Sequence, residues 1–127
     1  MSDLLLTSVF ALPLGALYFA LIVRVILLRR AGRVAFGDGD HKPLHGAIRA
    51  QGNAGEQTPL FLITFALGEM QDVPGLWLMV IGLVFVLGRF AHAYGMWFLV
   101  HRFRVYGTAL NLTGFLLALA ALATAVF

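Results

Sequence analysis

The stretch RAQGNAGEQTPLFLITF, residues Arg49 to Phe65, places charged side chains directly before an apolar run. Arg49, Asn53 and Glu56 are spaced i, i+4 and i+7, so at about 100° per residue they lie within about 60° of one another on an α-helix. Gln57 lies beside this stripe. A charge at the centre of a bilayer costs roughly 2.5–3.5 kcal/mol on insertion scales. We therefore expect the stripe to face the interior of a helical bundle and to pair internally or with a ligand.

The composition indicates a membrane protein. The chain has 127 residues, of which 61% are hydrophobic and 12% charged, whereas soluble domains have about 45–50% apolar and about 25% charged residues. Because there are so few charges, we interpret the net charge of +3 as an orientation signal and expect no nucleic-acid partner. The four histidines form no helix-spaced cluster with acids, so no metal site is predicted.

Four apolar stretches cover approximately residues 4–28, 47–70, 75–100 and 106–127. Each reaches the roughly 20 residues that a helix needs to cross a hydrocarbon core. Backbone polar groups must be satisfied internally in lipid, so each stretch is predicted to be helical. The fold class is therefore all-α: one domain, residues 1–127, forming an integral membrane four-helix up-down bundle.

The charges between these stretches predict the orientation. The first connection (residues 29–46) and the third, HRFR (residues 101–104), are basic, whereas the second connection and the N-terminal MSD are not. The positive-inside rule then places loops 1 and 3 in the cytoplasm and both termini outside. The first stretch is expected to remain as a span, because its basic cluster follows it, the reverse of a cleaved signal.

The third stretch carries a second polar pattern, with Arg89 and His92 at i, i+3, and Arg102 and Arg104 follow near its end. Glu56 is the only acid on the two stripes, and an excess of arginine favours an anionic ligand such as a carboxylate. An alternative is that Arg49 and Glu56 form an ion pair that only fixes the bundle, or that Arg49 extends to the interface. Taken alone, His92 is more typical of a structural histidine.

These residues resemble the MAPEG family, the membrane-associated proteins in eicosanoid and glutathione metabolism. Their second helix typically carries R-x-x-x-N-x-x-E-x-x-P, which Arg49, Asn53, Glu56 and Pro59 match. RRAGRV (residues 29–34) and GRFAHAYG (residues 88–95) resemble further blocks of the family. RVAFGDG (residues 33–39), AIRAQGNAGE (residues 47–56) and GRFAHAYG together look closest to a bacterial inner-membrane subgroup. The resemblance implies a left-handed bundle that assembles as a homotrimer and binds glutathione between subunits in the cytoplasmic half.

The resemblance also implies roles for individual residues. Arg49 would hold a glutathione carboxylate, while Asn53 and Glu56 would bind its polar backbone and amino group. Arg104 matches the arginine that stabilises the thiolate, with Arg102 as the competing candidate. The remaining implied site residues are His92, facing the glutathione, Arg30 and Gln51 at the rim or from the neighbouring subunit, and Gln57 and Arg89 beside the stripes.

The implied function is a glutathione-dependent membrane transferase or peroxidase, with glutathione as co-substrate and a lipophilic electrophile entering from the lipid. Two positions depart from the glutathione-binding pattern: Gln57 and Met96 stand where tyrosine is common. The alternative is a non-catalytic membrane protein that binds a small anionic or lipid ligand on the same scaffold. A purely structural bundle or a small transporter is the third possibility.

Overall fold

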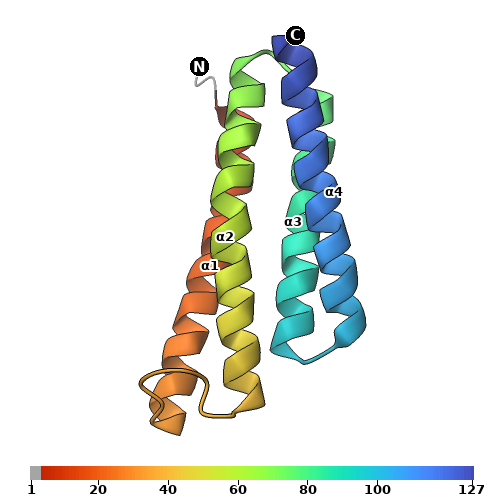
Figure 1. Ribbon diagram of the computed structural model, residues 1–127. Helices are drawn as coiled ribbons and strands as arrows, with labels where there is room; N and C mark the ends of the chain where they lie inside the picture. The colour runs from red at the N-terminus through yellow and green to blue at the C-terminus, as the bar shows by residue number, and fades with distance from the viewer. Residues whose placement is uncertain (1–3) are drawn as a thin grey trace.

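The computed structural model describes residues 4–127, and the N-terminal MSD used in the orientation prediction lies outside these residues. Four helices follow one another: α1 (Leu5–Gly32), α2 (Lys42–Met70), α3 (Gly75–Trp97) and α4 (His101–Val126). They run alternately up and down in one bundle, with the start of α1 and the end of α4 at the same end of the molecule (Figure 1). The predicted all-α up-down bundle is confirmed.

Three of the described helices, α1, α3 and α4, are long and apolar enough to cross a membrane by length and composition. The 29-residue helix α2 is not among them, because its polar stripe lowers its apolar character. It nevertheless packs against α1, α3 and α4 and runs the length of the bundle beside them (Figure 1). A membrane crossed by its neighbours is therefore crossed by α2 as well.

At the basic end of the bundle, α1, α2 and α4 extend beyond the predicted apolar stretches, whereas α3 ends at Trp97, before the predicted residue 100. HRFR, predicted as the third connection, forms the first turn of α4, and the actual connection is residues 98–100. Leu99 closes this short turn in the left-handed conformation (φ 57°). Similarly, α1 continues to Gly32 and α2 already begins at Lys42. Two features favour this start of α2: Pro43 lies in its first turn, and the His41 side chain accepts a hydrogen bond from the Leu44 N–H. Hydrophobicity marks the lipid-embedded part of a helix, whereas caps set its ends.

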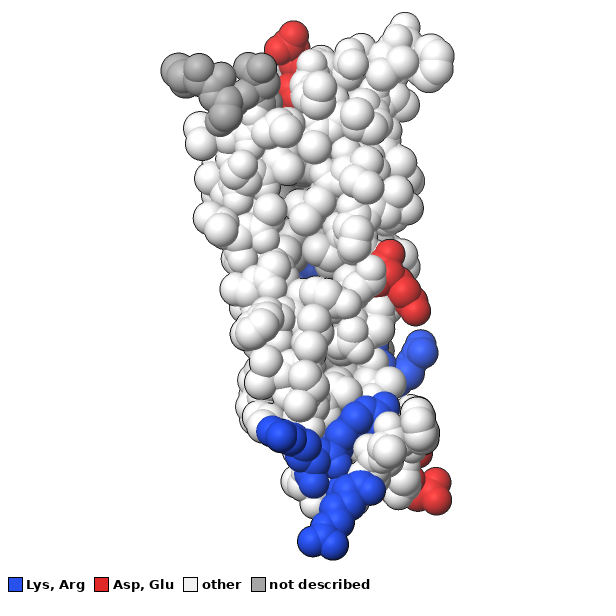
Figure 2. Space-filling view, turned by 90° about the vertical axis from the view of Figure 1, so that its left-hand side faces the viewer, with Lys and Arg blue, Asp and Glu red and all other residues white. Residues whose placement is uncertain are grey.

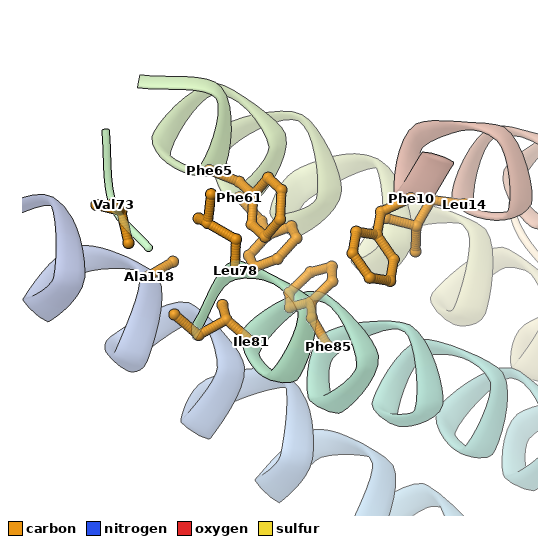
Figure 3. Close-up of a cluster of buried hydrophobic side chains, with 9 residues drawn as sticks. All are labelled: Phe10, Leu14, Phe61, Phe65, Val73, Leu78, Ile81, Phe85 and Ala118. Atoms are coloured by element: carbon orange, nitrogen blue, oxygen red, sulfur yellow. The ribbon is translucent and has the colours of Figure 1, made fainter. Parts of the chain in front are cut away.

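The apolar core occupies the half of the bundle that contains the chain termini. The rings of Phe61 and Phe85 stack with their centroids 3.6 Å apart, and Phe10 meets Phe65 edge-on at 5.6 Å. Figure 3 shows these side chains converging from α1, α2 and α3. The buried cluster consists of Phe10, Leu14, Phe61, Phe65, Val73, Leu78, Ile81, Phe85 and Ala118.

A carboxylate from α2 caps the first turn of α1 in this apolar half. Glu69 accepts hydrogen bonds from the backbone N–H groups of Leu6 and Thr7, both at 2.7 Å, and from the Thr7 hydroxyl at 2.6 Å. The first N–H groups of a helix have no intrahelical acceptor, and Leu4 provides no side-chain cap. Glu69 thus fixes α1 against α2. The polar stripes of α2 and α3 lie toward the opposite half of the bundle.

Candidate functional site

A cleft of ≈ 630 Å³ lies between α2, α3 and α4 in the half of the bundle opposite the apolar core. Four of the predicted site residues line it: Arg49 and Asn53 from α2, His92 from α3 and Arg104 from α4. This size falls within the roughly 300–1,000 Å³ typical of small-molecule sites. The other lining residues are His45, Met96, Val105, Thr108, Ala109 and Leu112.

The polar stripe of α2 turns gradually from the surface into the bundle. Relative to Arg49, Asn53 and Gln57 are rotated by about 40° and about 80° in one direction, and Glu56 by about 20° in the other. Arg49 and Glu56 are exposed in the protomer, whereas Asn53 and Gln57 are half-buried. The expectation that the whole stripe faces the interior is therefore wrong for Arg49 and Glu56. The stripe is wide, and only its Asn53–Gln57 edge reaches the interior side chains of α3.

Arg89 is the inward partner of this edge. Its side chain is 2% exposed, and Nη2 donates to Asn53 Oδ1 at 2.8 Å and to Gln57 Oε1 at 3.0 Å. Because the amide oxygen of Asn53 is engaged in this way, its NH₂ group is left to donate to an occupant of the cleft. The Nε and Nη1 atoms of Arg89 are buried without a hydrogen-bond partner in the described part of the chain. A positive charge without a neutralising acid therefore lies directly behind Asn53.

Within residues 4–127, the one ion pair joins His45 Nδ1 to Asp38 Oδ2 at 2.7 Å. The alternative in which Arg49 and Glu56 pair to fix the bundle is thus not seen within one protomer. These residues share a helix face but are two turns apart, roughly 10.5 Å along the axis. Both charges remain available for contacts outside the protomer.

Glycines set the positions of His92 and Arg104 where α3 meets α4. A Cβ atom added at Gly95 would lie 2.3 Å from the Arg104 backbone nitrogen, and one at Gly107 would lie 2.3 Å from the His92 backbone nitrogen. The two helices therefore touch backbone to backbone at the level of the cleft. Thr108 lies one turn after Arg104 and donates its hydroxyl hydrogen to the Arg104 carbonyl at 2.9 Å. The cleft wall made by α3 and α4 is consequently tightly packed.

Six predicted residues do not line this cleft: Glu56, Gln57 and Arg89, described above, and three that lie elsewhere. Gln51 donates to the Tyr18 hydroxyl at 3.1 Å, on the side of α2 that faces α1. Arg30 is exposed near the end of α1, and Arg102 is exposed in the first turn of α4 without lining the cleft. Of the two competing arginines, Arg104 is the one that the fold brings beside Arg49 and His92.

Two further residues line the cleft, His45 and Thr108, and neither was predicted to be a site residue. A signal was present, because His45 precedes Arg49 by four residues and Thr108 follows Arg104 by four, which places each pair on one helix face. A smaller pocket of ≈ 370 Å³ adjoins the cleft and shares His45 and Arg104 with it. Asp38 of the α1–α2 loop lies on its lining, so the pocket connects the cleft to that loop.

The apolar spans and the four-helix bundle define an integral membrane protein, with an arginine-rich cleft at one end of the bundle. The model of the MAPEG family matches residues 7–125, and the chain therefore belongs to the MAPEG family. A relative in Escherichia coli strain K12, inner membrane protein YecN, is 36% identical over 83 residues. The match covers 65% of this chain and 63% of the relative's length, and the YecN protein of Escherichia coli O6:H1 matches to the same extent.

Proposed function

We propose that this protein is a glutathione-dependent transferase or peroxidase that acts on lipophilic electrophiles in the membrane. The observation that carries the proposal is the cleft that unites Arg49, Asn53, His92 and Arg104 from three helices. Membership of a family named for glutathione and eicosanoid metabolism supports the choice of ligand. Glutathione is the co-substrate, and its reaction partner enters from the lipid.

The charges of the site suit this tripeptide. Arg49 and Arg104 line the cleft, and the uncompensated Arg89 lies behind it. Glutathione has two carboxylates, which pair well with guanidinium groups, and one ammonium group for Glu56. The free NH₂ of Asn53 adds a donor beside Arg49. Binding of a net-anionic ligand would therefore neutralise charges that the described part of the protomer leaves unpaired.

The exposed charges of α2 support a homotrimer with shared sites. Glu56 lies near the middle of α2, where contact with lipid would cost roughly 2.5–3.5 kcal/mol. A neighbouring protomer that covers Arg49 and Glu56 would remove this cost. Gln51 points about 200° away from Arg49 around α2, so it suits the site of a neighbour better than the site of its own protomer. Arg30, which is exposed on α1, is likewise assigned to the site of a neighbouring protomer.

The chemistry begins with the glutathione thiol. An ordinary thiol has a pKa near 8.5 and reacts as its thiolate, and a nearby guanidinium lowers that pKa by stabilising the anion. We assign this task to Arg104, with His92 facing the same cleft. In conjugation, the sulfur forms a bond to an electrophilic carbon, whose leaving group departs with its electron pair. In peroxide reduction, the sulfur bonds to one oxygen of the hydroperoxide as the O–O bond breaks, and the other oxygen leaves as an alcohol. A second glutathione then attacks the oxidised sulfur, which yields the disulfide and water.

The proposed location is the bacterial inner membrane, with loops 1 and 3 in the cytoplasm and both termini outside. Basic side chains gather at the end of the bundle that carries the α1–α2 loop (Figure 2). The positive-inside rule assigns such an end to the cytoplasm. The relative YecN is described as an inner membrane protein, which supports the same assignment. Glutathione would then reach the cleft from the cytoplasm through the pocket beside Asp38.

A non-catalytic protein that binds a small anionic or lipid ligand is the second candidate, and two site residues favour it. The amide oxygen of Gln57 is held by Arg89, and the cleft presents the Met96 thioether where many members have a tyrosine hydroxyl. Such a protein would bind its ligand without forming a thiolate or turning over electrophiles.

The ultraviolet absorbance of the thiolate distinguishes the two candidates in detergent-purified protein titrated with glutathione near neutral pH, where an ordinary thiol with a pKa of about 8.5 is mostly protonated. We expect a thiolate signal in the wild type that falls in Arg104→Ala while glutathione binding persists. Arg102→Ala is the matched control, since Arg102 lies in the same helical turn outside the cleft, and it should keep the signal. Saturable binding without thiolate in the wild type would overturn the catalytic proposal and establish the second candidate.

A further inference from the structure

An apolar groove of ≈ 510 Å³ runs along the outside of α3 between α1 and α4 and shares no lining residue with the arginine cleft. Its walls are almost wholly apolar and rich in aromatic rings. Tyr94 packs against Phe98 and Phe103 with ring centroids 4.7 and 4.9 Å away, and all three side chains are exposed. The complete lining is Leu17, Leu87, Phe90, Ala91, Ala93, Tyr94, Trp97, Phe98 and Phe103.

Arg24 adjoins this groove through Trp97, one of the residues that line it. The Arg24 guanidinium lies over the Trp97 ring, 3.8 Å from its centroid, and Nη2 donates to the Trp97 carbonyl at 3.1 Å. Its Nη1 is buried without a hydrogen-bond partner in the described residues, and none of the acids described there forms an ion pair with it. Arg24 is therefore fixed in place by an aromatic ring and a carbonyl, while its charge remains uncompensated.

The depth of Arg24 corresponds to the edge of the hydrocarbon core. The twenty residues from Leu5 to Arg24 carry no charge before Arg24 itself, and at about 1.5 Å per residue they span roughly the 30 Å of a hydrocarbon core. The capping carboxylate of Glu69 binds the other end of this segment at Leu6 and Thr7. Trp97, the last residue of α3, has the interfacial position that tryptophan favours in membrane proteins.

From this geometry we infer a specific lipid site: an anionic phospholipid of the basic-side leaflet lays one acyl chain in the groove and sets its phosphate at Arg24. The apolar aromatic wall suits a hydrocarbon chain, and the adjoining guanidinium suits a phosphate. Basic pockets between transmembrane helices on the cytoplasmic side are a recurrent way of binding anionic lipid head groups. A zwitterionic lipid would bring a second positive charge to Arg24 and would bind less well. This site is independent of the glutathione cleft.

The two tryptophans of the chain lie in different helical turns of α3, Trp77 in its first turn and Trp97 at its end. In Trp77→Phe protein, Trp97 is the sole tryptophan, so its fluorescence reports contact with the groove. Two kinds of phosphatidylcholine vesicle serve as probes: one contains phosphatidylglycerol with brominated acyl chains, and the other contains phosphatidylcholine with brominated acyl chains at the same mole fraction. We expect brominated phosphatidylglycerol to occupy the groove about fivefold more strongly than brominated phosphatidylcholine, the factor that one basic residue contributes at an anionic surface.

Variants in the Trp77→Phe background assign this preference to Arg24. Arg24→Gln should reduce the preference for brominated phosphatidylglycerol over brominated phosphatidylcholine to about one, and Arg24→Lys should restore part of the preference. Arg33→Asn removes a basic side chain outside the groove and should leave the preference unchanged. Circular dichroism checks that each variant keeps its helices. Equal quenching by both lipids, or a preference that survives in Arg24→Gln, would overturn the inference. Absence of quenching by either lipid would also overturn it, because the groove would then be covered by another copy of the chain.

Discussion

Replacing Gly107 by alanine tests the backbone contact that positions His92. The added Cβ would lie 2.3 Å from the His92 nitrogen and 2.6 Å from its Cα, whereas ordinary van der Waals contact begins at 3.4 Å. The atoms that it meets belong to the backbone, so no change of rotamer can relieve the overlap. Helices α3 and α4 must therefore separate by roughly 1 Å.

A matched glycine isolates the cost of this separation. Gly15 in α1 is also helical, and a Cβ added there meets no atom within 4 Å. Both substitutions gain the same helix propensity, about 0.8–1 kcal/mol for alanine over glycine. Overpacking in a close-packed interface costs typically about 1–3 kcal/mol. We therefore expect Gly107→Ala to be less stable than Gly15→Ala by about 1–3 kcal/mol.

The assay is reversible unfolding of the detergent-solubilised protein by increasing fractions of sodium dodecyl sulfate, followed by helical circular dichroism. The same displacement should also lower any glutathione-dependent turnover, because a misplacement of about 1 Å can cost about 100-fold in rate. If Gly107→Ala proves as stable as Gly15→Ala, then α3 and α4 do not meet as closely as the structure shows. The cleft wall would then not be tightly packed.

Two further predictions concern the ends of α1. Glu69→Gln should lower the free energy of unfolding by about 1–3 kcal/mol, because it weakens the acceptor of three hydrogen bonds. Asp72→Asn is the control. Equal losses of stability in both variants would contradict the capping role of Glu69. In the α1–α2 loop, the Asp40 backbone N–H and then the His45 side chain hold the pKa of Asp38 below its ordinary 3.8. The depressed value means that this stabilisation is present above pH 3.8 and is lost as the pH falls through the lower, folded-state pKa. The protection of the loop amides from hydrogen exchange, taken relative to the intrinsic exchange rate at each pH, should therefore fall at acidic pH in the wild type. Asp38→Asn should lack this protection at neutral and at acidic pH; unchanged protection in Asp38→Asn would contradict the prediction.

The sequence predicted the existence and order of the helices because lipid demands long apolar segments with internally bonded backbones. It placed their ends less well. HRFR reads as a loop because it is polar, yet arginine favours helices and the turn is closed by Leu99 in a left-handed conformation. The capping of α1 by Glu69 could not be predicted, since it depends on a contact between residues more than 60 positions apart.

Helical spacing predicted which side chains of one helix lie together, whereas contacts that depend on packing between helices were missed. Periodicity placed Arg49 beside Asn53, but it could not show that Arg89 holds the Asn53 amide oxygen, because that contact joins two helices. Which edge of the α2 stripe enters the bundle likewise depends on the crossing of α2 and α3. The glycines at 95 and 107 were visible in the sequence, but their role requires the register between α3 and α4.

Calorimetric titration of glutathione into the detergent-purified protein shows whether the arginine cleft binds glutathione. We expect saturable binding that is lost in Arg49→Ala, where the cleft loses a carboxylate partner. We also expect binding to be retained in Arg33→Asn, which removes a basic residue outside the cleft. Binding of equal strength in the wild type and in Arg49→Ala, or no binding by the wild type, would contradict the assignment of the arginine cleft as a glutathione site.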